Sequence, residues 1–287
     1  MQEFDFYSHR QIGENFHVVR ESYTNPKFGF NIYVVEGSDG IGVFDSGLGA
    51  TSALRRYIET FVSEKPMSCY ATHGDLDHIG GAILFDEAYM CGRDLYMLDW
   101  NLNVERRFSD LELFCGGDPA VLEFCRSRYI HNESLSFRAV DDGDVIDLGG
   151  VRLEAYRLPG HSAGSLAYYC RERGFALVGD AVSLHPAMQR CTDFKESFDC
   201  YERFFGHVVP SGTALYNGHD PEPQKHATAR DMMAGFKELL SGKTGTDRTT
   251  KWMFKCIHPD ELKYSLRVHD TGGVSMIYNA NAVREER

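Results

Sequence analysis

The hydrophobic and polar positions in the first third of the chain predict a hairpin, a helix and a further strand. The stretches N-I-Y-V-V-E-G (31–37) and I-G-V-F-D-S-G (41–47) are rich in β-branched and aromatic residues, and S-D-G joins them, which predicts a β-hairpin. In T-S-A-L-R-R-Y-I-E-T-F (51–61) the apolar residues recur at helical spacing, so an amphipathic helix is expected. M-S-C-Y-A-T-H (67–73) then predicts a short strand.

The second half of the chain repeats this plan. L-A-Y-Y-C (166–170) and F-A-L-V-G-D (175–180) predict another hairpin that ends in an aspartate. A helix is expected near 194–207, and G-T-A-L-Y-N-G-H (212–219) predicts a strand that ends in a histidine. This recurrence favours two β-rich layers packed face to face with helices outside, in a single domain over residues 1–287.

Two further regions are predicted outside this repeated plan. The interval 84–135 is expected to be a helical, lid-like insertion, and residues 221–287 are expected to form a C-terminal helix and hairpin. The aromatic residues of the insertion are Tyr96, Trp100, Phe108, Phe114 and Phe124. They are expected either to shape an apolar pocket or to pack the helices onto the sandwich.

Composition and charge narrow the classes of function. The 287 residues are 43% hydrophobic and 25% charged, and 30 Lys and Arg against 42 Asp and Glu give a formal charge of −12. Such acidity argues against nucleic-acid binding, which needs basic groups, and it mostly serves solubility. A small-molecule substrate is expected instead. A homodimer is compatible with this length and charge.

The sequence gives no sign of secretion or membrane insertion. No apolar run approaches the roughly 20 residues of a membrane span, and the N-terminus lacks a basic-then-apolar signal pattern. The cysteines are scattered at 69, 91, 115, 125, 170, 191, 200 and 256 without a C-x-x-C pair. This scatter predicts reduced, mostly buried thiols and a cytoplasmic location.

The segment A-T-H-G-D-L-D-H-I-G-G (71–81) crowds four ionisable side chains, His73, Asp75, Asp77 and His78, into six positions. In an extended segment the first three can point to one side, and the glycine turn can bring the fourth toward them. Left alone, such a cluster is costly, because neighbouring carboxylates repel and their desolvation is penalised. A divalent cation removes both costs, and imidazole with carboxylate favours Zn, Fe or Mn. The alternative is a polar turn whose charges lie in water.

Taken with four other motifs, this segment resembles the H-x-H-x-D-H signature of the metallo-β-lactamase superfamily. The motifs are F-D-S-G with Asp45, P-G-H-S-A-G-S with His161, L-V-G-D-A with Asp180 and N-G-H-D with His219. They occur in the family's order over about residues 30–220, and five ordered motifs are highly specific. The resemblance implies an α/β fold, a four-layer αβ/βα sandwich of two mixed β-sheets with helices on the outer faces.

The resemblance also implies a dinuclear metal site. One metal ion would be held by His73, Asp75 and His161, the other by Asp77, His78 and His219, and Asp180 would bridge the two together with a water or hydroxide. Asp77 would in addition help to orient the nucleophile, and Asp45 would orient a ligand from behind. His185 and Tyr216 are candidates to line the substrate pocket.

Position 75 departs from the family pattern, because most members place a histidine where this chain has Asp75. A third carboxylate makes the ligand set more negative, so the loaded site should be more neutral and more Fe- or Mn-like in preference. Flavodiiron proteins, in the same superfamily, carry Glu at the corresponding place and bind two irons. Asp75 is also shorter than a histidine, so it reaches a metal either directly or through a water.

The function that these motifs favour is a metal-dependent hydrolase. A hydroxide bridging two divalent metal ions would attack an ester, thioester, lactone or phosphoester. The alternative, prompted by Asp75, is a diiron oxidoreductase or a sensor of O2 or NO. A non-catalytic module that keeps the fold is a third possibility, against which the complete ligand set argues.

Overall fold

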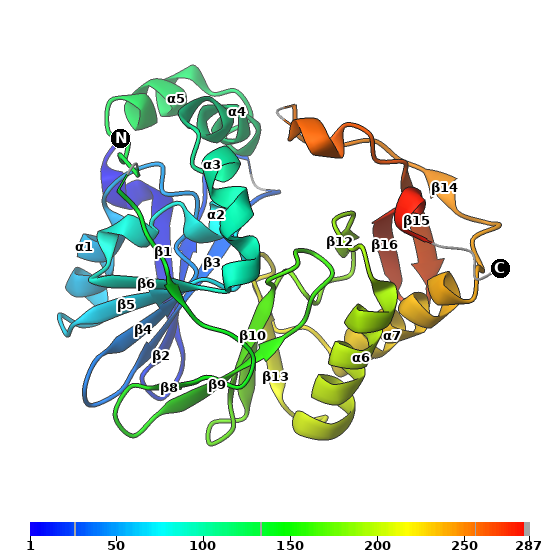
Figure 1. Cartoon of the computed structure of the whole chain (residues 1–287). Helices are drawn as coiled ribbons and strands as arrows, with labels where there is room; N and C mark the ends of the chain where they lie inside the picture. Colours follow the sequence, from blue (N-terminus) through cyan, green and yellow to red (C-terminus); the bar gives the residue numbers. More distant parts are fainter. Residues whose placement is uncertain (26, 133, 256, 284–287) are drawn as a thin grey trace.

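The structure is a computed structural model that describes residues 1–25, 27–132, 134–255 and 257–283. Two β-sheets stand next to each other, with helices on the outer side of each, and a smaller third sheet lies beyond the second group of helices (Figure 1). The two larger sheets and their helices position the residues singled out above.

The first sheet contains seven strands in chain order. They are β1 (Tyr7–Gly13), β2 (Phe16–Glu21), β3 (Phe30–Glu36), β4 (Ile41–Phe44), β5 (Met67–Tyr70), β6 (Glu87–Met90) and β7 (Arg138–Ala139). β1 to β4 pair antiparallel, and β4 to β7 pair parallel. The predicted hairpin of 31–37 and 41–47 is therefore confirmed as β3 and β4. The predicted insertion at 84–135 begins with η2 (Ala82–Leu84) and then β6, so its first part belongs to the sheet.

The second sheet has the order β13-β11-β10-β9-β8. Its strands are β8 (Val145–Asp147), β9 (Arg152–Arg157), β10 (Leu166–Cys170), β11 (Phe175–Gly179) and β13 (Ala214–Asn217). All neighbours are antiparallel except β11 and β13. Aromatic rings join the two sheets: Phe16 stacks on Phe175 at 4.0 Å between centroids, and Phe44 lies 5.0 Å from Tyr168. The predicted sandwich of two mixed sheets is confirmed.

The helices cover the outer faces of these sheets. They are α1 (Leu54–Phe61), α2 (Leu76–Ile79), α3 (Leu98–Asn101), α4 (Val104–Phe114), α5 (Pro119–Arg126), α6 (Phe194–Arg203) and α7 (His226–Leu240). Residues of α1, α4 and α5 share one buried apolar cluster with the first sheet, and residues of α6 and α7 share another with the second sheet. Short turns complete the helical content, 3-10 turns at Glu3–Phe6, Gly92–Met97, Pro259–Glu261 (η5) and Ala280–Ala282 and a π-helical turn at Phe204–Val208.

The C-terminal region adds a four-stranded sheet that the sequence did not predict. It contains β12 (Ala187–Met188), β16 (Val274–Asn279), β15 (Leu266–Thr271) and β14 (Arg248–Thr249). The hairpin β15–β16 was expected, but β12 and β14 have two residues each, too few to produce a periodic signal. Met276 and Tyr278 on β16 pack with α7 in the apolar cluster of the second sheet.

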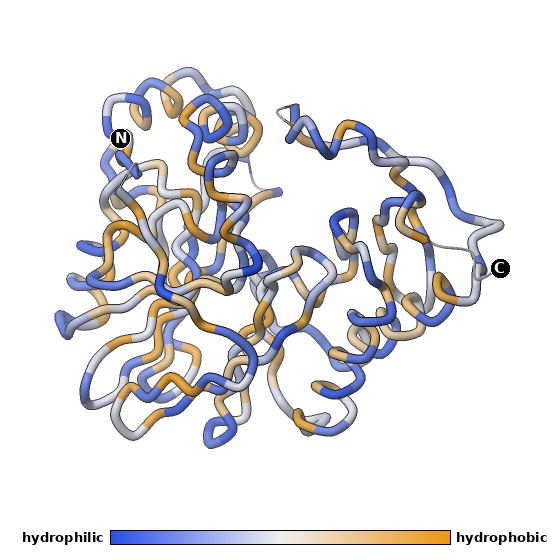
Figure 2. Tube along the Cα trace, viewed as in Figure 1, coloured by the Kyte–Doolittle hydropathy of each residue, from blue (hydrophilic) through white to orange (hydrophobic). Residues whose placement is uncertain are grey.

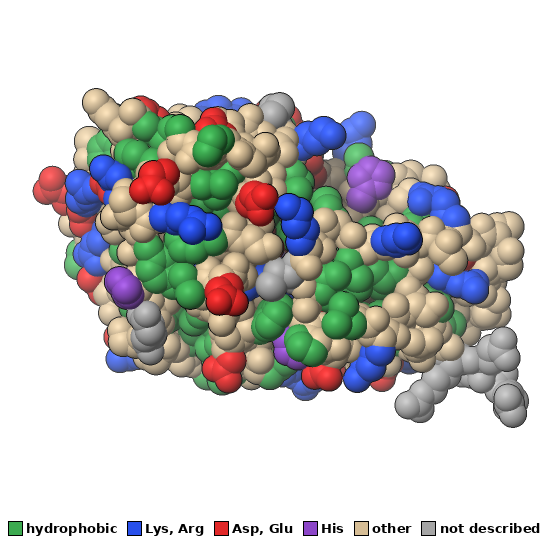
Figure 3. All heavy atoms as spheres, turned by 90° about the horizontal axis from the view of Figure 1, so that it is seen from above, with side chains coloured by type: hydrophobic (Ala, Val, Ile, Leu, Met, Phe, Trp, Pro, Cys, Tyr) green, Lys and Arg blue, Asp and Glu red, His purple; other side chains and the backbone are tan. Residues whose placement is uncertain are grey.

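Hydropathy follows this arrangement. Hydrophobic stretches, orange in Figure 2, run along the strands of the two larger sheets, and the connecting loops are mostly blue or white. On the face drawn in Figure 3, hydrophobic side chains lie among acidic and basic ones. The seven described cysteines are all free thiols, six of them buried and Cys200 partly exposed; Cys256 lies outside the described residues. Within the described ranges, no helix combines the length and apolar character needed to cross a bilayer.

Candidate metal centre and cavity

The predicted metal-binding residues follow the carboxyl ends of strands from both larger sheets. His73 follows β5, and His161 follows β9. Asp180 comes directly after β11, and His219 lies two residues beyond β13. Because β4 and β5 are parallel, and β9, β11 and β13 point the same way, these ends meet along one edge of the sandwich. Loops at such an edge commonly carry functional groups.

The 71–81 segment differs in one respect from the expected extended chain. It bends over residues 72–75, and Asp75 caps the short helix α2, so that Asp77 and His78 lie within a helical turn. Successive helical residues are rotated by about 100°, and this rotation, not the glycine turn, brings Asp77 and His78 toward the same centre. The expectation of alternating side chains through position 77 was wrong.

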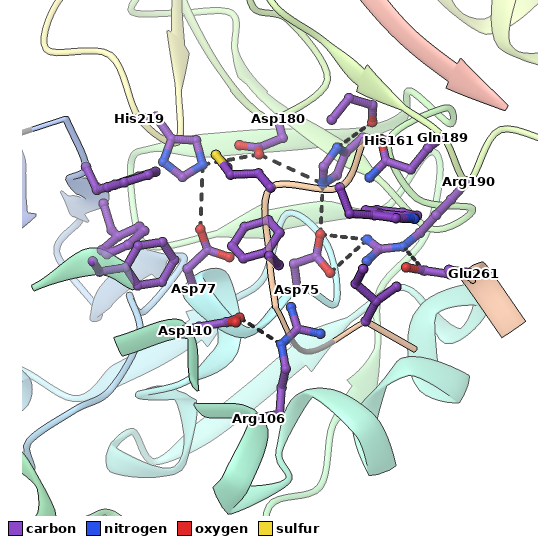
Figure 4. Close-up of a pocket in the computed structure, with 18 of the residues that line it drawn as sticks. Asp75, Asp77, Arg106, Asp110, His161, Asp180, Gln189, Arg190, His219 and Glu261 are labelled. Carbon is purple, nitrogen blue, oxygen red and sulfur yellow. Dashed lines mark hydrogen bonds and ion pairs between the residues drawn. The ribbon is translucent and has the colours of Figure 1, made fainter. Parts of the chain in front are cut away.

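The structure brings all seven predicted side chains together, and Figure 4 shows five of them, Asp75, Asp77, His161, Asp180 and His219. Three groups have ligand atoms within 4.8 Å of one another: His73, Asp75 and His161; Asp77, His78 and His219; and His73, His78 and Asp180. Asp180 lies between the first two groups, because its Oδ2 is 3.8 Å from His161 Nε2 and 3.2 Å from His219 Nε2. This convergence agrees with the predicted grouping, and the ligand roles themselves stay predictions.

Unpaired polar atoms show that these residues fit divalent cations. Among the described residues, no hydrogen-bond partner contacts His73 Nε2, His78 Nε2 or Asp180 Oδ1, although all three atoms are buried. A buried polar atom without a partner is costly. All three atoms belong to donor types that Zn, Fe and Mn accept. Gly218 matters for their approach, because a Cβ there would lie 2.6 Å from His78 Cε1 and 2.8 Å from Asp180 Oδ1.

Asp45 supports this centre from behind, as a residue orienting a ligand would. Its Oδ2 accepts a hydrogen bond from His78 Nδ1 at 2.8 Å, and Thr72 donates its backbone N–H and its hydroxyl to the two oxygens at 2.7 and 2.9 Å. This bond leaves His78 Nε2 facing the centre. Asp45 has a φ of 63°, a conformation that Asp and Asn adopt more readily than most residues.

Asp94 joins the two loops that carry His73, Asp75 and His161. Its carboxylate is fully buried and accepts hydrogen bonds from Gly74 N at 3.0 Å, Ser162 Oγ at 2.5 Å and Gly164 N at 2.7 Å. The sequence did not suggest this role, because Asp94 lies outside the recognised motifs.

Arg190 pairs with Asp75 in a way that the sequence also did not predict. Its Nη1 lies 2.8 and 2.7 Å from the two oxygens of Asp75, and its Nε lies 2.6 Å from Glu261 Oε1 (Figure 4). The charge balance inferred from the sequence omitted this guanidinium. Asp75, Arg190 and Glu261 together carry a net charge of −1, so Arg190 does not by itself cancel the extra charge that Asp75 brings. The more Fe- or Mn-like metal preference inferred from that charge stays a prediction.

Burial and neighbouring charges shift the pKa values at the centre in opposite directions. Burial and then His78 lower the pKa of His73. Burial would also lower the pKa of His78, but carboxylates, Asp45 foremost, raise it well above its usual range. Burial would lower the pKa of His219, but the carboxylate of Asp180 raises it to about 9. Burial would raise the pKa of Asp180, but His219 and His78 hold it well below its usual range. Cation binding would displace the imidazole protons.

A cavity of about 320 Å³ opens onto this centre, a size within the roughly 300–1,000 Å³ of small-molecule sites. One wall is polar and contains five of the predicted ligands, Asp75, Asp77, His161, Asp180 and His219. Further lining comes from the residues leading into β3, from α4 and from the C-terminal segment 252–261, and it combines apolar side chains with the Arg106–Asp110 ion pair of α4 (Figure 4). Its apolar residues are Phe28, Phe30, Phe114, Trp252, Met253, Phe254 and Ile257.

Some residues expected at the pocket lie elsewhere. His185 is exposed and Tyr216 packs against Phe16, and neither lines the cavity. Among the five aromatic residues of the insertion, Phe114 alone lines it. Phe108 and Phe124 pack against the core of the first sheet, as the packing alternative expected. Trp252 and Phe254 were missed because their segment reads as a polar linker and its end.

Comparisons with known proteins agree with this site. The family model described as "Metallo-beta-lactamase superfamily" matches residues 27–239 of this chain. The acyl-coenzyme A thioesterase MBLAC2 of Homo sapiens is 28% identical over 203 residues, which covers 63% of this chain and 68% of that protein. A hydroxyacylglutathione hydrolase of Erythrobacter litoralis is 28% identical over 147 residues, which covers 47% of this chain and 58% of that protein.

Solved structures share the fold. A metallo-beta-lactamase family protein from Thermus thermophilus aligns with a TM-score of 0.57 at 19% identity, covering 82% of this chain and 84% of that one. A beta-lactamase domain protein from Burkholderia ambifaria aligns with a TM-score of 0.59 at 14% identity, covering 81% and 77%. At this identity the likeness shows the fold alone.

Proposed function

The chain belongs to the metallo-beta-lactamase superfamily and is a metal-dependent hydrolase of that fold, and we propose that it hydrolyses thioesters with an apolar acyl group. The observation that carries this proposal is the cavity with two unlike walls, one bearing the predicted metal ligands and the other lined by apolar side chains. The names of two relatives support it, because coenzyme A and glutathione carry acyl groups as thioesters.

The apolar wall suits the acyl chain. Phe114 contacts Phe30 edge to face at 4.8 Å between centroids and Phe28 at 5.1 Å, and Phe254 lies 6.3 Å from Phe114. These rings lie next to one another in the lining of the cavity, and Phe30 also contacts the predicted ligand His219 edge to face at 5.7 Å between centroids. Each buried methylene of a substrate would contribute about 0.8 kcal/mol there, so binding should strengthen as the acyl chain lengthens.

The polar wall suits the reacting carbonyl. In thioester hydrolysis water adds to the carbonyl carbon, the C–S bond breaks, and a carboxylic acid and a thiol leave. Divalent ions bound here would supply Lewis-acid polarisation and would lower the pKa of water. Asp77 would orient the attacking water, with its Oδ2 3.7 Å from His219 Nε2 and 3.8 Å from His78 Nε2. Asp45 would hold His78 in the orientation that leaves Nε2 free for the centre.

The diiron alternative stays a second prediction. It depended on the additional charge of Asp75, which pairs with Arg190, but Glu261 pairs with the same guanidinium. A cytoplasmic location and a homodimer stay predictions; the free thiols of the described cysteines favour the former.

A panel of acyl thioesters tests the proposal. Protein loaded with zinc or manganese is assayed for thiol release from acetyl-, octanoyl- and palmitoyl-coenzyme A and from the corresponding glutathione thioesters, and for release of octanoic acid from the octanoyl oxygen ester of a simple alcohol. We expect thiol release whose kcat/KM rises with acyl length, and its loss in Asp77→Asn. Full metal loading with no thiol release from any thioester would contradict the proposal.

A further inference from the structure

Arg190 links one of the two predicted metal positions to the C-terminal segment. Its guanidinium lies between the carboxylates of Asp75 and Glu261, and the side chains of Arg190, Asp75 and Glu261 are only 11, 15 and 13% exposed. Both oxygens of Asp75 lie within 2.8 Å of Arg190 Nη1. Oδ2 of Asp75 is also 2.9 Å from His161 Nε2, so this carboxylate already has partners on two sides.

The other predicted metal position has no such cation. The ion pairs of Asp77 are with His78 and His219, and within the described ranges no Lys or Arg pairs with Asp77 or with Asp180. Its supporting group is Asp45, a carboxylate, which strengthens His78 as a donor. The two positions therefore differ in the charged group that contacts one of their ligands: a guanidinium contacts Asp75, and a carboxylate contacts His78.

This difference has a direct consequence for metal affinity. A guanidinium bound to a carboxylate withdraws charge from its oxygens and repels a divalent ion approaching the same carboxylate. A carboxylate behind a ligating imidazole has the opposite effect. Substitution of a group that contacts a metal ligand typically changes the metal affinity by about 10–100-fold. We expect Arg190 to change the metal affinity of the position that contains Asp75 by a factor of this size.

We propose that Arg190 makes the two metal positions unequal. The position of Asp77, His78 and His219 fills first, and the position of His73, Asp75 and His161 binds its ion more weakly because Arg190 competes for Asp75. Glu261 moderates this competition, since it neutralises Arg190 from the far side.

The moderating residue comes from a segment that lines the cavity. Beside the pair of Glu261 with Arg190, residues of this segment contact the helical region: Lys255 lies 3.3 Å from Glu112 of α4, and His258 lies 5.2 Å from Trp100 of α3. The ring of Phe254 lies 6.3 Å from that of Phe114 of α4. A substrate that displaces the segment would therefore alter how strongly Arg190 holds Asp75, and with it the affinity of the weaker position.

Stepwise titration of metal-free protein with Zn²⁺, followed by calorimetry or by competition with a chromophoric chelator, tests the proposal without any substrate. The native chain should bind two ions with affinities at least about tenfold apart. In Arg190→Gln the weaker step should tighten about tenfold, because the repelling charge is gone. In Glu261→Gln the same step should weaken by several-fold, and the tighter step should stay unchanged in both.

Two further variants distinguish the proposed effect on metal affinity from an effect of misfolding. Arg190→Gln/Glu261→Gln removes both partners of the Arg190–Glu261 pair, so that neither of these two groups is left as an unmatched charge, and it too should tighten the weaker step. Arg203→Gln breaks a similar two-oxygen pair with Asp142 on the surface and should leave both steps unchanged. Equal affinities in the native chain would overturn the proposal. So would no change or weakening in Arg190→Gln, or a shift of the same sign in Glu261→Gln.

Discussion

The two walls of the cavity differ in origin and in how firmly the fold holds them. The polar wall is built from strand ends of both sheets, and its loops are fixed by hydrogen bonds that the buried carboxylates of Asp45 and Asp94 accept. Of the apolar wall, Phe30 and Phe114 belong to the buried core, and the rest comes mostly from the segment 252–261, which lies in the chain between β14 and the hairpin of the third sheet. Reaction chemistry should therefore depend on rigid, deeply supported groups, and substrate choice on a surface that the rest of the fold constrains less.

This difference predicts a graded response to substitution. Changes behind the polar wall should affect stability and metal binding whatever the acyl group. Changes in the apolar wall should have smaller effects that depend on acyl length.

The largest effect is expected for Asp94→Ala. The substitution leaves Gly74 N–H, Gly164 N–H and the Ser162 hydroxyl without their acceptor, and a buried unsatisfied donor costs about 1–3 kcal/mol. We expect the free energy of unfolding of the metal-free protein to fall by about 4 kcal/mol, measured by urea denaturation. Asp99→Ala, at an exposed position of nearby α3, is the control. A loss no larger than that of the control would mean that Asp94 does not fix these loops.

The next effect concerns Glu21, which accepts hydrogen bonds from Leu48 N at 2.6 Å and from Tyr23 at 2.8 Å and so anchors the loop after Asp45. Burial raises the pKa of Glu21 from 4.5 to about 7, despite these hydrogen bonds. Between these values the folded protein keeps a proton that the unfolded chain has released. The stability that this protonation contributes is fully present below pH 4.5 and is lost as pH rises through 7.

We therefore expect the native chain to lose about 3 kcal/mol of unfolding free energy relative to Glu21→Gln across that pH range. Urea denaturation at several pH values measures the difference, and exposed Glu14→Gln serves as the matched control. A difference between the native chain and Glu21→Gln that does not vary with pH would show that Glu21 is charged in the folded state.

A moderate effect is expected for Asp45→Asn. Asparagine tolerates the φ of 63° at this position, but it lacks the charge that holds His78 Nδ1 and the two donors of Thr72. Loss of such a partner typically costs about 10–100-fold in metal affinity, which Zn²⁺ titration measures. Asp39→Asn, on the turn between β3 and β4, provides a control distant from the centre. Unchanged affinity in Asp45→Asn would contradict its predicted orienting role.

The smallest effect is expected in the apolar wall. Trp252→Ala removes a partly exposed ring that lines the cavity, and its contact with a long acyl chain should be worth about 1.4 kcal/mol, a tenfold change. KM for palmitoyl-coenzyme A should rise about tenfold, with a progressively smaller change for shorter chains. Equal changes for acetyl and palmitoyl thioesters would show that this wall does not hold the acyl chain.

The same comparison explains how much the sequence could predict. The residues of the polar wall could be predicted because they lie in short motifs directly after strands. The strand pattern gives their place in the fold, and their residue types indicate metal binding. Arg190, Glu261 and Asp94 could not, because each acts on a residue distant in sequence and none stands in a motif. The extra charge of Asp75 called for a compensating cation, but 30 Lys and Arg residues were candidates. Trp252 and Phe254 were missed because they stand in no motif and directly follow a polar stretch of the chain.

Anomalous X-ray diffraction from a crystal grown with zinc tests the central claim most directly. The account predicts two peaks among the seven side chains: one at Asp77, His78 and His219 with full occupancy, and one at His73, Asp75 and His161 that reaches full occupancy only at higher zinc concentration. No peak at this centre under zinc-replete conditions would contradict the metal site. Equal filling of both positions at every zinc concentration would contradict the inequality attributed to Arg190.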